Sequence, residues 1–117
     1  EQRRFVRLET AIGIHYKTAN SSATGTIPKR EGEISGGGVR FATGQRLQPG
    51  TQLELELMLA GEPAPVQAKG EVVWSGRLNQ RRPYEAGVRF TEIDPLQRGK
   101  VIRVIHDSLK ARCLLKT

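Results

Sequence analysis

Hydrophobic and polar residues alternate along most of the chain before Asp94, with the two-residue period of half-buried β-strands. In residues 53–59 every second residue is a leucine, and Glu54 and Glu56 stand between the leucines. We expect the leucines to face a core and the glutamates to face solvent. Residues 10–18, 39–41, 66–74 and 86–90 also alternate and predict further strands, and residues 27–34 can form another strand that leads into a glycine-rich turn.

Turn-forming residues separate these runs. Segments rich in glycine, proline, serine, threonine or asparagine predict loops, of which the longer ones are residues 19–26, 45–50 and 61–65, and a basic loop follows at residues 77–83. About six strands joined by turns and followed by a helix are typical of a small antiparallel β-barrel or curled sheet. A β-sandwich is the alternative, because register and closure depend on contacts between distant segments.

The end of the chain has the pattern of a helix. Asp94 and Pro95 are typical of an N-cap and a first helical residue, and Gln97 follows the cap by three residues, as in a capping box. Four apolar residues follow at helical spacing and predict the face that packs on the barrel, namely Val101, Ile102, Ile105 and Leu109. The predicted organisation is one domain, with an arm at residues 1–9, a barrel at 10–93 and a helix at 94–117.

Length and charge narrow the possible partners. The 117 residues suffice for a single hydrophobic core. The net charge of +7 attracts anions, which include nucleic acid, membrane headgroups and phosphorylated ligands. Only 5% of the residues are aromatic, which disfavours a barrel that binds single-stranded nucleic acid by stacking its bases.

The sequence also excludes several kinds of chemistry. A single cysteine, Cys113, precludes an internal disulfide, and two histidines alone do not make a zinc site. No apolar run approaches the roughly 20 residues of a membrane span and no secretion signal opens the sequence, so we expect a reducing, cytoplasmic setting. No nucleophile and base stand at motif spacing, so we expect neither an enzyme nor a cofactor.

Two segments carry candidate binding chemistry, and the first is the arginine-rich start of the chain. Arg3, Arg4 and Arg7 lie in a stretch that is too charged and too short to bury itself. Arginine grips phosphate through two parallel hydrogen bonds and stacks its flat face on rings. Its bidentate contact with O6 and N7 of guanine discriminates between bases by about 1–3 kcal/mol. The arm therefore suits an anionic ligand that carries a purine.

The second segment is the glycine-rich turn after the second predicted strand. Glu33, Ser35 and Gly38 offer a carboxylate, a hydroxyl and a position without a side chain, and Gly36 and Gly37 complete a turn whose glycines permit positive φ angles. On an extended backbone Glu33 and Ser35 face the same side. The carboxylate can accept hydrogen bonds from N1 and N2 of guanine, and the glycines let a ligand lie against backbone amides. An ordinary hairpin turn beside a basic tail is the alternative.

The order of these segments matches a known family. RRFVR, then EISGGG, then VVW and YEAGVRF before a closing helix, resemble PilZ domains, the bacterial receptors for the second messenger cyclic di-GMP. The family is marked by RxxxR in an N-terminal arm and by D/N-x-S-x-x-G on the barrel. The resemblance covers nearly the whole chain and implies a six-stranded antiparallel β-barrel with a C-terminal α-helix.

The resemblance also implies roles for individual residues. Arg3 and Arg7 match the two motif arginines and Arg4 matches a frequent additional one, so all three would clasp the guanine bases and phosphates. Ser35 and Gly38 match the barrel motif directly.

Two further positions match the family less directly. Glu33 stands where the family has Asp or Asn, and its extra methylene keeps the acceptor but moves it. Trp74 stands where the family tends to place an aromatic or apolar residue near the ligand. The alternative for Trp74 is a core tryptophan on the face that carries Val72.

The resulting hypothesis is a regulatory switch that works by ligand binding and not by catalysis. Cyclic di-GMP would draw residues 1–9 onto the barrel and reshape the surface that a protein partner or a flanking domain meets. Two alternatives stay open. One is a PilZ-like protein-interaction module that binds no ligand, which the presence of Glu33 suggests. The other is a basic barrel that binds single-stranded nucleic acid, which the net charge suggests.

Overall fold

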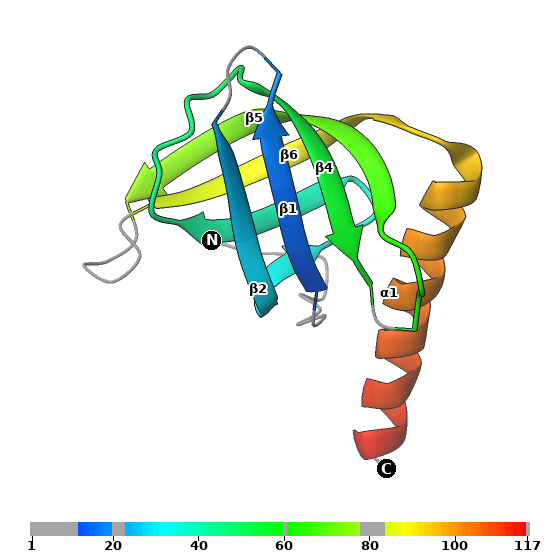
Figure 1. Cartoon of the computed structure of the whole chain (residues 1–117). Helices are drawn as coiled ribbons and strands as arrows, with labels where there is room; N and C mark the ends of the chain where they lie inside the picture. The colour runs from blue at the N-terminus through cyan, green and yellow to red at the C-terminus, as the bar shows by residue number, and fades with distance from the viewer. Residues whose placement is uncertain (1–11, 20–22, 60, 78–83, 117) are drawn as a thin grey trace.

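Six antiparallel strands close into a barrel, and one helix packs beside it (Figure 1). The computed structural model describes residues 12–19, 23–59, 61–77 and 84–116, and its side-chain description leaves out residues 28–31 and 108–116. The elements are β1 (Ile12–Thr18), β2 (Thr24–Ile34), β3 (Gly38–Thr43), β4 (Gln52–Met58), β5 (Val66–Arg77), β6 (Tyr84–Ile93) and α1 (Pro95–Lys116). Around the barrel the strands follow the order β1-β2-β3-β6-β5-β4, and β4 pairs with β1 to close it.

The predicted antiparallel barrel is confirmed, and β2 is longer than the sequence indicated. The loop predicted at residues 19–26 is wrong from residue 24 onward, because residues 24–26 pair with β1. Gly25 lies against the ring of Tyr16, and a side chain at position 25 would overlap that ring. The small residue that suggested a loop therefore makes room for a large one on the neighbouring strand.

Alternate side chains from all the strands fill the barrel. The buried ring of Tyr16 stacks on Phe41 with 5.5 Å between the ring centroids, and its hydroxyl lies 3.4 Å from Oγ1 of Thr43. The predicted inward face of residues 53–59 is confirmed, because each of its leucines is at most 4% exposed. Burying a side chain of this size stabilises the fold by about 1.5–3 kcal/mol. The core thus fixes the strands whose outward side chains form the candidate site.

Helix α1 begins where the sequence predicted, but one of its cap residues has a different partner. The Oδ1 atom of Asp94 accepts a hydrogen bond of 2.8 Å from the backbone N–H of Leu96, which confirms the N-cap. Gln97 turns to the barrel instead of closing a capping box. Its Oε1 accepts a hydrogen bond of 3.2 Å from the backbone N–H of Gln67 and ties α1 to β5.

The face by which α1 packs on the barrel differs from the predicted stripe. Val101 and Val104 are buried and Ile105 packs against the core, whereas Ile102 is 52% exposed. Positions 101, 104 and 105 follow the i, i+3, i+4 spacing of a single helix face. Ile102 is turned by about 100° from Val101, so its predicted place in the stripe is wrong.

Ion pairs support the docked half of the helix. Lys100 and Arg103 lie 3.7 and 3.9 Å from the carboxylate of Glu62, which stands in the turn between β4 and β5. Figure 1 shows the later turns of α1 continuing past the strands. In the described ranges, no helix combines the length and the apolar character that a membrane crossing requires.

Candidate ligand-binding face

The glycine-rich turn between β2 and β3 is closed by Ser35. The backbone N–H of Ser35 donates a hydrogen bond of 2.9 Å to the carbonyl oxygen of Gly38, and its hydroxyl donates to the same oxygen over 3.3 Å. The hydroxyl also accepts a hydrogen bond of 3.3 Å from the N–H of Gly37. On the far side of the turn, the N–H of Phe90 in β6 donates to the carbonyl oxygen of Gly37 over 2.9 Å. Ser35 therefore shapes the turn through its own hydrogen bonds.

The three glycines of the turn serve different purposes. A Cβ at Gly38 would overlap the carbonyl oxygen of Val88, so only glycine lets β3 approach β6 at this point. A Cβ at Gly36 or Gly37 would meet nothing within 4 Å. The turn does not use the positive φ angles that its glycines permit, because the positive-φ glycines of the described chain are Gly50 and Gly61. Gly36 and Gly37 thus leave backbone open to solvent.

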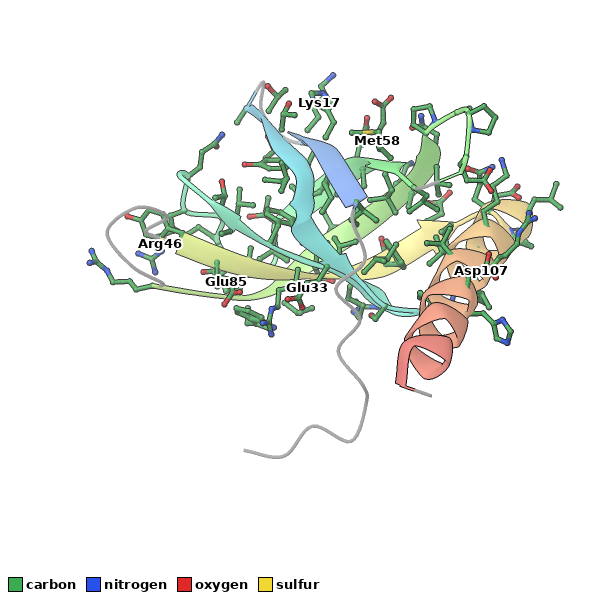
Figure 2. All side chains as sticks on the ribbon, turned by 90° about the horizontal axis from the view of Figure 1, so that it is seen from below. Lys17, Glu33, Arg46, Met58, Glu85 and Asp107 are labelled. Carbon is green, nitrogen blue, oxygen red and sulfur yellow. The ribbon has the colours of Figure 1, made fainter. Side chains whose placement is uncertain are left out.

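A row of residues crosses four neighbouring strands beside this turn. Glu33 of β2 is the pairing partner of Arg40 in β3, and Arg40 is in turn the partner of Gly87 in β6. Gly87 pairs with Trp74 of β5. Figure 2 shows Glu33 on one side of the barrel, together with Glu85, and Lys17 and Met58 on the other. The strand register therefore brings two sequence-predicted site residues, Glu33 and Trp74, onto one face.

Trp74 reaches this outer face because β5 contains a bulge. The register shifts between Val72 and Trp74, so Val73 is an extra residue and the alternation is broken. Val72 is buried, whereas Trp74 is 40% exposed and Val73 is 46% exposed. The alternative that Trp74 shares the core face of Val72 is therefore wrong. Gly87 makes the room, since a Cβ there would overlap Nε1 of the indole.

Arg40 occupies the centre of the row and was missed by the sequence analysis. Its Nε lies 3.8 Å from Oε1 of Glu33 and 3.2 Å from Oε2 of Glu85, and its Cζ lies 6.0 Å from the centroid of the Trp74 ring. The Glu85 contact has the distance of an ion pair but lacks hydrogen-bond alignment, because Nε is buried with no hydrogen-bond partner among the described residues. The sequence pattern could have predicted its outward orientation, because Arg40 alternates with the inward-facing Val39 and Phe41.

The predicted site residues thus fall into two groups. In one group, Glu33 and Trp74 lie at the two ends of the row on the outer face, and the turn beside Glu33 contains Ser35, Gly36, Gly37 and Gly38. The other group, Arg3, Arg4 and Arg7, lies outside the described residues. Within the described part of the chain, no three His, Cys, Asp or Glu side chains gather as metal ligands would.

The fold and this face define a small barrel that presents acidic, cationic and aromatic groups beside an open glycine turn. A family model described as PilZ domain matches residues 1–107. The chain belongs to the PilZ domain family, whose members are regulatory ligand-binding modules. The comparison with curated proteins gives no match.

Solved structures with a similar fold include a PilZ domain and two other proteins. The PilZ domain of YcgR from Escherichia coli, solved with c-di-GMP, is 15% identical with a TM-score of 0.65, over 96% of this chain and 95% of that one. MrkH of K. pneumonia is 18% identical with a TM-score of 0.74, over 100% of this chain and 54% of that one. The motility inhibitor MotI/DgrA of Bacillus subtilis is 18% identical with a TM-score of 0.70, over 96% of this chain and 54% of that one. The chain therefore spans about half the length of MrkH and MotI.

Proposed function

We propose that this domain is a cytoplasmic bacterial receptor for cyclic di-GMP, and that it acts by binding rather than by catalysis. The observation that carries the proposal is the row that joins Glu33 through Arg40 to Trp74 on one face, beside the open turn of Ser35, Gly36 and Gly37. Membership of the PilZ family supports the proposal. So does the similar fold of the YcgR PilZ domain, which was solved with c-di-GMP.

The base-recognition part of the proposal rests on Trp74 and Glu33. An exposed indole is a stacking surface for a purine, and stacking of a base on an aromatic side chain contributes about 1–3 kcal/mol. The carboxylate of Glu33 lies one strand beyond Arg40 in the same row and is about one third exposed on its side chain, at 34%. It can accept hydrogen bonds from N1 and N2 of guanine. The open backbone at Gly36 and Gly37 leaves space for the ligand to lie close.

The phosphates need a different partner. Among the described residues, Glu33 and Glu85 place two carboxylates beside the guanidinium of Arg40. Like charges at short range repel, which disfavours a phosphate at this point. We assign the two phosphates to the arginines within residues 1–9, whose forked guanidinium groups match phosphate oxygens.

The regulatory part of the proposal is the movement of residues 1–9 onto the barrel. A ligand that contacts both the arm arginines and the outer face couples the two segments, because it is bound most tightly when both sets of contacts form. Fixing the arm over the turn would change the surface that a protein partner or a flanking domain meets. The output of such a change depends on that partner.

A second candidate function follows from Glu33. The motif of the family has Asp or Asn there, and the longer side chain of Glu33 lies 3.8 Å from Arg40 through its Oε1. A PilZ-like module that binds a protein and no nucleotide would tolerate this change. In that case Glu33→Asp would leave binding of the partner unchanged and would create no nucleotide affinity.

Calorimetric titration with cyclic di-GMP tests the proposal. We compare the wild-type domain with Arg3→Ala, Arg7→Ala and, as a charge-matched control, Arg46→Ala, which alters an exposed residue in the turn between β3 and β4. A charge-assisted hydrogen bond contributes about 1.5–3 kcal/mol, so each arm variant should bind on the order of 10- to 100-fold more weakly. The control should bind as the wild type does.

Two outcomes would contradict parts of this picture. Equal affinities in all four proteins would overturn the arginine clasp while leaving a nucleotide receptor in place. Absence of cyclic di-GMP binding by a folded wild-type domain would overturn the receptor function and favour the protein-interaction module.

A further inference from the structure

We propose that Arg40 is a base-specificity residue, which donates from its terminal nitrogens to O6 and N7 of a guanine whose N1 and N2 face Glu33. This inference rests on the proposed function and adds to it a residue that stands outside the sequence motifs. The strand register supports it, because Glu33 and Arg40 are direct pairing partners on neighbouring strands. Side chains at such paired positions stand side by side on one face of the sheet.

The described hydrogen bonds do not use the two terminal nitrogens of the Arg40 guanidinium. The ion-pair distances of Arg40 to Glu33 and to Glu85, 3.8 and 3.2 Å, are both measured from Nε. Nε is itself buried, while the side chain as a whole is 19% exposed. In the described part of the molecule, the terminal N–H groups of Arg40 donate no hydrogen bond, and they are the natural donors to a ligand.

The guanidinium is also held in place before any ligand binds. Glu33 and Glu85 stand on either side of Arg40, on β2 and β6, and the Trp74 ring lies 6.0 Å from its Cζ. A fork that is already oriented loses less side-chain entropy when it forms hydrogen bonds. Trp74 offers a stacking surface beside the same fork, so one base could contact both residues.

The edges of guanine fit this pair of side chains. Going around the base, two donors, at N2 and N1, are followed by two acceptors, O6 and N7. A carboxylate beside a guanidinium presents two acceptors followed by two donors, which is the complementary order. Adenine has an amino group at the position of O6, so its donor would face the donors of Arg40. The pair Glu33 and Arg40 therefore favours guanine over adenine.

The competing interpretation is that Arg40 only balances the charges of Glu33 and Glu85. If Arg40 were purely structural, its replacement would change the affinity for every ligand of this face by the same factor, because it would touch none of the base atoms. A specificity residue must instead show an effect that depends on the atoms it contacts. Changing one acceptor on the ligand separates the two roles.

The experiment compares cyclic di-GMP with its 7-deazaguanine analogue, in which CH replaces N7 of each base. Calorimetry is performed on the wild-type domain, Arg40→Met, Arg40→Lys and the charge-matched control Arg46→Met. The wild type and the control should bind the analogue on the order of 5- to 150-fold more weakly than cyclic di-GMP, which is the discrimination expected of a bidentate arginine. In Arg40→Met that ratio should fall toward one, and Arg40→Lys should behave similarly because a single ammonium lacks the fork.

Each remaining outcome decides against a specific claim. If Arg40→Met lowers the affinity for both ligands equally and leaves the ratio of the two affinities unchanged, Arg40 is structural. The inference is then overturned, although the receptor function stands. If the wild type binds neither ligand, the proposed function fails first. Melting temperatures of all variants accompany the titrations, and the folded Arg40→Lys variant keeps the test decisive if Arg40→Met does not fold.

Discussion

Arg98 of α1 donates a hydrogen bond from Nη1 to the carbonyl oxygen of Gly36, at 3.1 Å. The two residues are 62 positions apart in the sequence, so the contact joins the glycine turn of the candidate site directly to the C-terminal helix. The neighbouring carbonyl, that of Gly37, is bound by the N–H of Phe90. The turn is thus held from β6 and from α1, and a ligand that moves it would act on the helix as well.

Replacing Arg98 should loosen the turn and lower the affinity for the ligand. The hydrogen bond is exposed, and a typical net contribution of about 0.5–1.5 kcal/mol corresponds to a change of about two- to tenfold in affinity. We expect Arg98→Ala to raise amide exchange at Gly37 and to lower cyclic di-GMP affinity by a factor in this range. Arg103→Ala, on the same helix, is the matched control. Unchanged exchange at the turn would show that Arg98 does not restrain it.

Glycine should be essential at position 38 and dispensable at position 36. A Cβ at Gly38 would overlap the carbonyl oxygen of Val88, which belongs to the backbone and cannot rotate away. We expect Gly38→Ala to lower the free energy of unfolding by about 1–3 kcal/mol, the usual cost of overpacking. Gly36→Ala, where a Cβ would meet nothing within 4 Å, should change it little. Urea unfolding measures both, and equal stabilities would contradict the close approach of β3 and β6.

Gly87 should control the position of Trp74. An added Cβ at Gly87 would overlap the indole Nε1, so Gly87→Ala should push the ring outward. Trp74 is the only tryptophan of the chain, which makes its fluorescence a direct measure of this movement. We expect a red-shifted emission and weaker cyclic di-GMP binding in Gly87→Ala. The matched control is Gly76→Ala, also at the β5–β6 pair, because a Cβ there would meet nothing within 4 Å.

An unshifted emission spectrum in Gly87→Ala would contradict the packing of the indole on Gly87. A shifted spectrum with unchanged ligand affinity would instead show that Trp74 packs as described but does not contact the ligand. The two readouts thus separate the position of the ring from its proposed use.

Local patterns in the sequence determined the class of fold and the motif residues of the candidate site. The alternation of residues 53–59 fixed which side of β4 is buried, because side chains on a strand point to opposite faces in turn. The carboxylate of Asp94 fixed the start of α1, because an N-cap residue bonds only to backbone N–H groups in the first turn that follows it. Ser35 and Gly38 were identified by their spacing within one hairpin. All of these features depend on neighbours close in sequence.

Tertiary structure decided the features that depend on pairing between distant strands. The bulge at Val73 turned Trp74 out of the core, and the register placed Arg40 between Glu33 and Trp74. Periodicity tells which face a side chain occupies, but it does not tell which residue of another strand lies opposite. That choice is made when the barrel closes, because closure fixes register, bulges and close approaches together. For the same physical reason, the bond between Arg98 and Gly36 exists only in the folded domain.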